Sequence, residues 1–285
     1  AEDMSRGKFG SRAAVTGVSE VRQLAGAFNV MADKLAQVEE NRREFVANVS
    51  HELRSPVTSI HGFVEGMLDG TIPETEHGRY LQVVSDETNR LKKLINDLLE
   101  LSRMEKGVVA LNVTTFDINE AIRRVIIGRM NDIDSRGIAL HLEFEQEPCP
   151  VRADQDRIAQ VVYNLTDNAL KFINDKGNLT IRTRLVHDKV SVIVANDGAP
   201  ILPEDRPHIF ERFYKADKAH TVGKGSGTGL GLSICVRILQ QHGQTIRLLP
   251  TENGAAFEFT LESGSRAMPL GEGDGKREQR GAERE

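Results

Sequence analysis

Apolar residues recur at steps of three and four along the N-terminal part of the chain, which is the spacing of an amphipathic helix. One series comprises Val21, Leu24, Phe28, Met31, Leu35 and Val38, and it continues without a break into Phe45 and Val49. A further series on the same spacing comprises Val46, Val49, Leu53, Val57, Ile60, Val64 and Met67. The pattern therefore predicts one helix that runs through residue 40.

A second helical pattern spans residues 80–104. Its apolar face comprises Leu81, Val84, Thr88, Leu91, Ile95 and Leu98. Residues 68–74, Leu-Asp-Gly-Thr-Ile-Pro-Glu, separate the two patterns and are typical of a helix end and a turn. We therefore predict a helical hairpin over 41–107. Alone it would expose a continuous apolar face, so we expect a homodimer in which two hairpins form a four-helix bundle.

His51 lies away from the apolar face of the first helix. At about 100° per residue, the stripe from Val46 to Met67 is roughly 80° wide, and His51 projects about 160° from its centre. An exposed neutral imidazole is a nucleophile, and the adjacent Glu52 can accept its proton. On these residues alone, a surface histidine without a role remains an open interpretation.

From about residue 111 the pattern changes to alternating helices and strands. We expect helices near 117–134, 154–172 and 229–242. We expect strands at 138–144, 178–187, 189–196, 244–250 and 256–262, of which the second and third form a hairpin around residues 187–189. This order predicts an α+β sandwich over 111–263, with helices on one face of a mostly antiparallel sheet. Residues 264–285 are rich in Gly, Glu and Arg and are expected to form a disordered tail.

Composition narrows the functional class only slightly. A length of 285 residues allows about two domains, and 39% hydrophobic and 28% charged residues are ordinary for a soluble protein. The net charge of -5 gives no argument for a nucleic-acid partner. Cys149 and Cys235 lack the spacing of a metal site or a disulfide framework. No apolar run is long enough to span a bilayer, and because the sequence begins with Ala1 we expect an upstream part to be missing.

Three polar residues share one face of the helix expected at 154–172. Asn164, Asn168 and Lys171 stand at i, i+4 and i+7, whereas the apolar residues lie largely elsewhere. Two amide oxygens and an ammonium suit a magnesium–triphosphate, because Mg²⁺ takes few protein ligands and Lys neutralises phosphate charge. A solvated polar face is the alternative for this segment.

Two further segments carry polar groups next to apolar anchors. Asn196, Asp197 and Gly198 end a strand, where a side chain can exchange hydrogen bonds with a purine amine while Gly198 allows close approach. In residues 209–215, Arg212 and Lys215 flank aromatic residues and can reach phosphate oxygens. A plain turn and a small hydrophobic cluster are the respective alternatives.

A dense glycine-rich segment, Gly-Lys-Gly-Ser-Gly-Thr-Gly-Leu-Gly-Leu at 223–232, opens directly onto a helix. Glycines let backbone N–H groups converge on phosphate, and the helix N-terminus adds partial positive charge. It is not a Rossmann turn, since no strand immediately precedes it, and not a Walker A loop, since no Lys-Ser/Thr follows the glycines.

In this order, the segments resemble the sensor histidine kinases of two-component signalling over roughly residues 41–263. Residues 50–56 (Ser-His-Glu-Leu-Arg-Ser-Pro) are similar to the H box of that family, 164–172 to its N box, 196–201 to its G1 box, 209–214 to its F box and 227–232 to its G2 box. The resemblance implies a dimeric helical bundle that carries a phospho-accepting histidine, followed by a Bergerat-type ATP-binding sandwich.

The resemblance also implies roles for individual residues. The γ-phosphoryl group of ATP would pass to His51, with Glu52 as base, and then to an aspartate in the receiver domain of a response regulator. Asn168 and Asn164 would hold Mg²⁺. The residues expected at the ATP site are Asn164, Asn168, Lys171, Asn196, Asp197, Gly198, Arg212, Lys215, Gly227, Thr228, Gly229, Leu230 and Gly231.

Residues 1–40 resemble the C-terminal part of a HAMP linker, with Glu20 before an apolar heptad helix. In the family such linkers follow a transmembrane helix. We therefore expect this chain to be the cytoplasmic portion of an inner or plasma membrane protein, attached through an N-terminal transmembrane segment that is missing here.

Two positions depart from the family pattern. The G1 box usually opens with Asp and carries two glycines, whereas alignment on Gly198 and Ile201 places Asn196 and Pro200 there. We favour Asn196 over Asp197 as the base-contacting residue and expect altered adenine affinity or lid mobility. Ser55 stands where many relatives have Thr or Asn, one turn beyond His51, where a hydroxyl can orient water against a phosphorylated regulator.

The leading hypothesis is therefore an ATP-dependent protein histidine kinase with phosphatase activity as well. A protein whose net output is phosphatase, and a non-catalytic dimeric scaffold with a degenerate ATP site, are the alternatives. Asn168, Lys171 and the glycines of 227–231 argue against the scaffold, and the His51 helix argues against a stand-alone ATPase.

Overall fold

The structure, a computed structural model, describes residues 12–16, 18–105, 110–216 and 227–264. The chain divides into two compact units. One, the helical unit, comprises Ala1–Glu100 together with Thr228–Leu230, and the other, the sheet unit, comprises Leu101–Gly227 and Gly231–Glu285. Residues 1–11 and 17 of the expected HAMP linker, and nearly all of the expected tail, lie outside the described residues.

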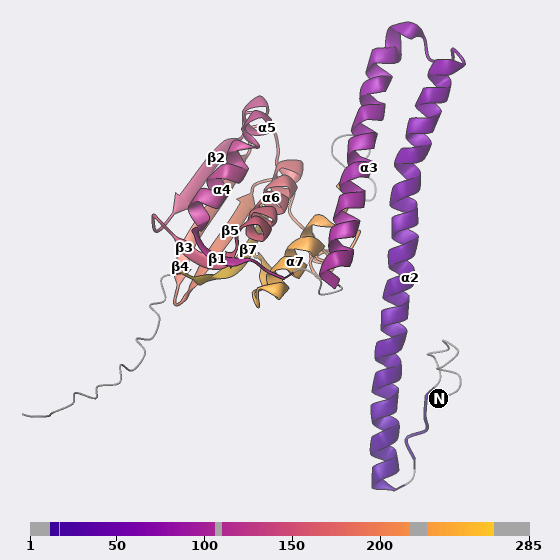
Figure 1. Cartoon of the computed structure of the whole chain (residues 1–285), viewed down its shortest axis with the longest axis vertical. Coiled ribbons are helices and arrows are strands. Elements are labelled where there is room, and N and C mark those ends of the chain that lie inside the picture. Colours follow the sequence, from indigo (N-terminus) through magenta and orange to yellow (C-terminus); the bar gives the residue numbers. More distant parts are fainter. Residues whose placement is uncertain (1–11, 17, 106–109, 217–226, 265–285) are drawn as a thin grey trace, which may run out of the picture. The chain divides into compact units, whose positions relative to one another are not determined.

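The helical unit is built from two long helices joined by a short connection (Figure 1). Helix α2 runs over Ser19–Leu68 and helix α3 over His77–Glu105, with the short 3-10 helix η1 at Glu74–Glu76 between them. The predicted hairpin is thus confirmed, including the continuous helix through residue 40. Pro56 lies inside α2 without ending it, although proline cannot donate the usual backbone hydrogen bond.

The closed end of the hairpin is held by packing between α2, the turn and α3. The rings of Phe63 and Tyr80 have centroids 5.1 Å apart. Ile72 donates a backbone hydrogen bond of 2.7 Å to the Gly66 carbonyl, and a Cβ on Gly66 would lie 3.1 Å from the Ile72 side chain. The small residue at 66 therefore lets the turn fold back closely onto α2.

Much of the apolar stripe of the hairpin is not covered within the chain. The exposed apolar side chains include Val46, Val57, Val64, Leu81, Ile95 and Leu99. Exposed apolar side chains that recur along a helix face, when they form a contiguous surface, mark interaction sites in soluble proteins. Among the described residues, none of the helices combines the length and the apolarity that crossing a membrane requires.

The sheet unit alternates strands and helices (Figure 1). Its helices are α4 (Ile118–Ile127), α5 (Met130–Ser135), α6 (Gln155–Phe172) and α7 (Gly231–Gln241). Its strands are β1 (Val113–Asp117), β2 (Ala139–Phe144), β3 (Pro150–Asp154), β4 (Asn178–Val186), β5 (Lys189–Asn196), β6 (Ile246–Leu249) and β7 (Ala255–Ser263).

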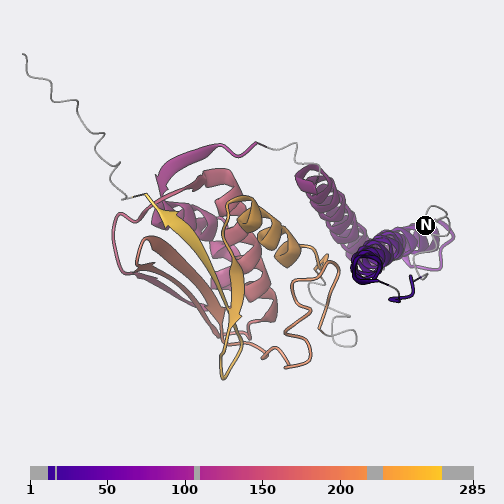
Figure 2. The same cartoon turned by 90° about the horizontal axis from the view of Figure 1, so that it is seen from below.

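These strands form one sheet in the order β1-β3-β7-β5-β4-β2, with β6 also paired to β7. All pairings are antiparallel except β2 with β4. Strands β4 and β5 form the predicted hairpin, in which Val186 pairs with Lys189 and His187 adopts φ 59. The helices lie on one face of this sheet (Figure 2), as the sequence pattern predicts.

The core of the sheet unit lies between the sheet and helices α4, α6 and α7. On α6 the fully buried residues include Ile158, Val161, Val162 and Leu165, and the helix contacts β5 and α7. Aspartates set the starts of two helices: the Asp117 side chain accepts from the Asn119 amide, and that of Asp154 accepts from the Arg157 amide. This anchoring orients the opposite, polar face of α6 toward the candidate site.

Two details differ from the sequence expectation. The helix expected near 117–134 is interrupted, because α4 ends at Ile127 with Gly128 as its C-cap, and Arg129 has φ -114 before α5 begins. Strands β1 and β3 were not predicted. Each is 5 residues long, too short to show clear alternation, and they pair with each other from Val113 with Asp154 to Asp117 with Pro150.

Candidate functional site

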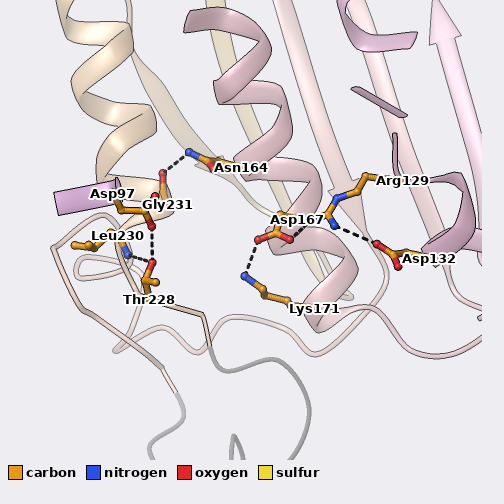
Figure 3. A network of polar contacts seen from close by, with 9 residues as sticks. All are labelled: Asp97, Arg129, Asp132, Asn164, Asp167, Lys171, Thr228, Leu230 and Gly231. Atoms are coloured by element: carbon orange, nitrogen blue, oxygen red, sulfur yellow. Dashed lines mark hydrogen bonds and ion pairs between the residues drawn. The ribbon is translucent and has the colours of Figure 1, made fainter. Parts of the chain in front are cut away.

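The polar face of α6 meets the end of the glycine-rich segment. The Asn164 amide donates a hydrogen bond of 3.4 Å to the Gly231 carbonyl at the start of α7 (Figure 3). Lys171 lies about two helical turns beyond Asn164 on α6. A Cβ on Gly227 would lie 3.2 Å from the Lys171 Nζ. The fold thus brings Asn164 and Lys171 next to residues that are more than fifty positions away in the sequence. At Gly227 a side chain would be crowded, whereas at Gly231 a Cβ would make ordinary contact, 3.8 Å from the Asn164 side chain.

Asn168 lies between these two residues on the same helix. It is half-buried, and its side chain makes no hydrogen bond with another described residue. Its amide oxygen is therefore available to an incoming ligand. An open cavity of about 870 Å³ adjoins Lys171, and its lining includes the cations Arg136 and Lys176 as well as the acids Asp134 and Asp175.

An acidic residue not predicted as part of the site lies next to Lys171. The Lys171 ammonium donates a 2.7 Å hydrogen bond to Asp167, one turn earlier on α6. The second carboxylate oxygen of Asp167 accepts from Arg129, which also binds Asp132 at 3.1 Å (Figure 3). The cationic partners of Asp167 among the described residues therefore include one on α6 and one at the start of α5.

The end of strand β5 carries the base-site candidates. Asn196 is only 7% exposed, and its Nδ2 has no hydrogen-bond partner among the described residues. The Asp197 carboxylate instead accepts a 2.6 Å hydrogen bond from the Asn178 side chain. Burial is the largest single influence on Asp197 and opposes its ionisation, but the hydrogen bonds from Asn178 and from the Asp197 backbone together outweigh it, so the pKa of Asp197 lies below its usual value. The Asp197 carboxylate thus already accepts a hydrogen bond within the protein, whereas the buried Nδ2 of Asn196 can still donate one to a ligand.

Gly198 is needed for the backbone to reach this position. A Cβ there would lie 1.8 Å from the Phe172 carbonyl oxygen at the end of α6. Such a distance is far below van der Waals contact, so no side chain fits without a shift of the backbone. The strand end is thereby held directly against the helix that carries Asn164, Asn168 and Lys171.

The segment 209–215 is anchored by its aromatic and apolar residues. Ile209 is buried, and the Phe210 ring lies edge-on to Phe257 with centroids 6.1 Å apart. The Tyr214 hydroxyl donates a 2.6 Å hydrogen bond to the buried Asp205, which raises the pKa of Tyr214 to about 12. Arg212 remains exposed and Lys215 half-buried. The predicted hydrophobic cluster and the predicted charged residues therefore coexist in one segment.

Residues Thr228–Leu230 belong to the helical unit rather than the sheet unit. Gly229 has φ 72, a conformation that favours glycine, and Leu230 is fully buried. The Thr228 hydroxyl donates a 3.0 Å hydrogen bond to Asp97 on α3 and accepts one of 3.4 Å from the Leu230 amide (Figure 3). Asp97 was not among the predicted site residues.

On the helical unit, His51 is exposed on α2, as its position relative to the apolar stripe predicts. The neighbouring Glu52 is less accessible, with 19% of its side chain exposed, and it forms a 3.2 Å ion pair with Arg90 on α3. Ser55, one turn further along α2, is exposed. The candidate nucleophile thus faces solvent, while the candidate base is fixed to the second helix.

Sequence reasoning missed Arg90, Arg129 and Asp205, all of which contact predicted site residues or their anchors. Each of the three pairs with a residue that lies on another element or several positions away in a loop. The spacing of residues along the sequence therefore does not predict these contacts. Asp167 was visible within the segment 164–172 but had no predicted role.

Comparison with known families identifies three successive regions. The HAMP domain model matches residues 1–37, and the His Kinase A (phospho-acceptor) domain model matches 41–107. The model described as histidine kinase-, DNA gyrase B- and HSP90-like ATPase matches 153–265. The chain belongs to the sensor histidine kinases.

Individual sensor kinases show the same relationship. Sensor histidine kinase YclK of Bacillus subtilis is 32% identical over 249 residues, which are 85% of this chain and 52% of that protein. Sensor protein SrrB of Staphylococcus aureus is 34% identical over 229 residues, 79% of this chain and 38% of that protein. The chain thus spans about half or less of the length of these relatives.

Solved histidine kinase structures share the fold. Acinetobacter baumannii histidine kinase AdeS is 26% identical with a TM-score of 0.63, covering 75% of this chain and 98% of that one. Histidine kinase ThkA, solved in complex with response regulator protein TrrA, is 32% identical with a TM-score of 0.66, covering 81% of this chain and 66% of that one. The predicted order, a helical phosphoacceptor region followed by a mixed α/β ATPase domain, is therefore confirmed.

Proposed function

We propose that this chain is an ATP-dependent protein histidine kinase. It transfers the γ-phosphoryl group of ATP to a ring nitrogen of His51, leaving ADP, and then passes that group to an aspartate of a response regulator receiver domain. The observation that carries the proposal is the meeting of Asn164 and Lys171 with Gly231 and Gly227. Amide oxygens, an ammonium and exposed backbone at a helix N-terminus are the groups that a magnesium–triphosphate requires.

Within the sheet unit, each part of the nucleotide has candidate partners. Asn168, with Asn164, is proposed to hold Mg²⁺, which neutralises phosphate charge when bound. Lys171, Arg212 and Lys215 supply cations for the phosphates. Asn196 supplies a buried amide at the base, a role supported by its spare donor and by the engagement of Asp197 with Asn178. The glycines at 227, 229 and 231 let backbone N–H groups approach the phosphates.

Within the helical unit, His51 is the proposed nucleophile and Glu52 its base. The exposure of His51 leaves one ring nitrogen open to an electrophile. Glu52 removes the proton from the other nitrogen as the P–N bond forms, and Arg90 holds the carboxylate in place. Transfer of this kind depends mainly on positioning and charge neutralisation.

The proposed assembly is a homodimer that docks a receiver domain. The uncovered apolar residues of α2 and α3 support pairing of two hairpins into a four-helix bundle. A related kinase, ThkA, has been solved with response regulator TrrA, which supports the same class of partner here. The match to a HAMP domain supports attachment to a membrane through a preceding segment, with this part on the cytoplasmic side.

We also propose that the chain dephosphorylates its regulator. Ser55 is exposed one turn beyond His51, where its hydroxyl can orient a water molecule against an acyl phosphate. The test is the rate of loss of label from a phosphorylated regulator in the presence of ADP. Ser55→Ala is expected to slow that loss while leaving the labelling of His51 unchanged, and an unchanged rate would refute the role of Ser55.

The kinase proposal is tested by incubating the purified chain with γ-labelled ATP and Mg²⁺. We expect label that is lost in acid and kept in alkali, the stability of a phosphorus–nitrogen bond. The same chain should then transfer label to a receiver domain. A chain that binds ATP but acquires no label would favour the non-catalytic scaffold instead.

Replacing Glu52 with glutamine is expected to slow labelling by about 100-fold, the usual contribution of a general base, without changing the affinity for ATP. Glu44→Gln, at an exposed position of the same helix, serves as the matched control and should leave the rate unchanged. Arg90→Gln removes the ion pair but keeps the carboxylate, so it should slow the reaction less. An equal loss in both variants would show that only the ion pair matters.

A further inference from the structure

We propose that Arg129 is a positioning residue for the phosphate-binding Lys171 and acts through the carboxylate of Asp167. The inference rests on the proposed function, because it assumes that Lys171 receives the phosphates of ATP. Arg129 has no expected contact with the nucleotide. Its effect is to balance the charge that Lys171 leaves behind when it turns to the phosphates.

Asp167 shares its two oxygens between two cations (Figure 3). Lys171 Nζ binds one oxygen at 2.7 Å, and Arg129 Nη2 binds the other. All three side chains are largely shielded from water, with 19% of Arg129, 15% of Asp167 and 27% of Lys171 exposed. Charge interactions at this depth are much less screened than at the surface, so each partner changes the environment of the other two.

Arg129 is the fixed member of this group. Its guanidinium also binds Asp132 at 3.1 Å and lies 4.7 Å from the centre of the Tyr163 ring. A planar guanidinium held on several sides is pre-organised, whereas the lysine ammonium sits on a flexible stem. When phosphates arrive, we therefore expect Lys171 to move while Arg129 stays on Asp167.

Lys171 needs only a small movement to reach the proposed phosphate position. Its Nζ already lies 3.2 Å from where a Cβ on Gly227 would be, and thus beside that glycine. If Arg129 were absent, Asp167 would hold Lys171 more firmly and would face the phosphates with a less fully balanced negative charge. Both effects weaken the binding of phosphates, and neither should alter binding of the base.

The test compares Arg129→Gln, Asp167→Asn and the double variant in the full chain. We expect Arg129→Gln to raise the Kd for Mg–ATP about tenfold, as loss of one well-placed charge at a part-buried site does. Adenosine, which lacks phosphates, should bind with unchanged affinity by NMR titration. Because Asp167→Asn removes the charge that Arg129 balances, the double variant should return to within about threefold of the wild-type Kd.

Two further variants separate charge from folding. Arg124→Gln removes an exposed arginine from the neighbouring α4, whose side chain makes no hydrogen bond or ion pair with the described residues, and it should leave the Kd unchanged. Arg129→Lys keeps the charge and should retain most of the affinity. Circular dichroism and thermal unfolding of each variant show whether the fold persists.

The inference is overturned if Arg129→Gln leaves ATP binding unchanged, or if it weakens adenosine binding to the same extent. It is also overturned if Asp167→Asn does not restore the double variant, because the role of Arg129 would then be structural. In all of these cases a wild-type chain that binds and uses ATP would leave the proposed function intact. A wild-type chain that binds no ATP would refute both.

Discussion

Replacing His51 with glutamine is expected to reduce labelling by γ-labelled ATP to background while leaving ATP binding intact. Glutamine is similar in size and polar, but its amide nitrogen is not a nucleophile, so no phosphorus–nitrogen bond can form. His51 is exposed on α2, and a change there removes no core contact. The variant should therefore keep its helical content and its Kd for ATP.

The matched control is His61→Gln on the same helix. His61 is also exposed and pairs with Glu65 at 3.4 Å, so it resembles His51 as a surface histidine with an acidic neighbour. We expect His61→Gln to be labelled as fully as the wild type. If His51→Gln kept full labelling, the assignment of the acceptor would be wrong, whatever the outcome at His61.

Asn168→Ala is expected to abolish labelling as well, but for a different reason. The substitution removes the amide oxygen proposed for Mg²⁺ at a half-buried position of α6, and Mg²⁺ has few other protein ligands to replace it. Binding of ATP should lose its dependence on Mg²⁺, whereas binding in the absence of the metal should change little. Titration with ATP at several Mg²⁺ concentrations measures this directly.

Asn168→Asp provides the contrasting variant, since a carboxylate oxygen can also bind Mg²⁺. We expect it to retain part of the labelling and the Mg²⁺ dependence. Unchanged Mg²⁺-dependent labelling in Asn168→Ala would refute the metal role. A loss of helical content would instead show that the side chain is needed for folding, and Asn168→Asp would then decide between the two explanations.

Much of the fold was predictable because long periodic patterns determine it. The stripe from Val21 to Met67 predicted α2, and the paired runs around His187 predicted the β4–β5 hairpin. Strands β1 and β3 could not be predicted because each holds only 5 residues, and because each pairs with a strand that is distant from it in the sequence. The break in the helix at Gly128 was not predicted from the sequence. The apolar spacing continues across Gly128, but the helical conformation of the backbone is interrupted at Arg129.

In the candidate site, too, some features could be predicted from local sequence patterns and others could not. Asn164, Asn168 and Lys171 could be placed on one face from helical spacing alone, and the structure brings the first and last of them to the glycine-rich segment. The distant partners of Glu52, Asp167 and Thr228, which are Arg90, Arg129 and Asp97, could not be foreseen. They are 38, 38 and 131 positions away in the sequence, and side-chain pairing over such distances depends on the completed fold.

The central claim, that ATP phosphorylates His51, is tested most directly by locating the label in the wild-type chain. Cleavage by trypsin after Arg43 and Arg54 releases peptide 44–54, in which His51 is the only histidine. We predict that the label resides in this peptide, in an acid-labile and alkali-stable bond. Label in another peptide, or an acid-stable bond such as Ser50 would form, would contradict the account.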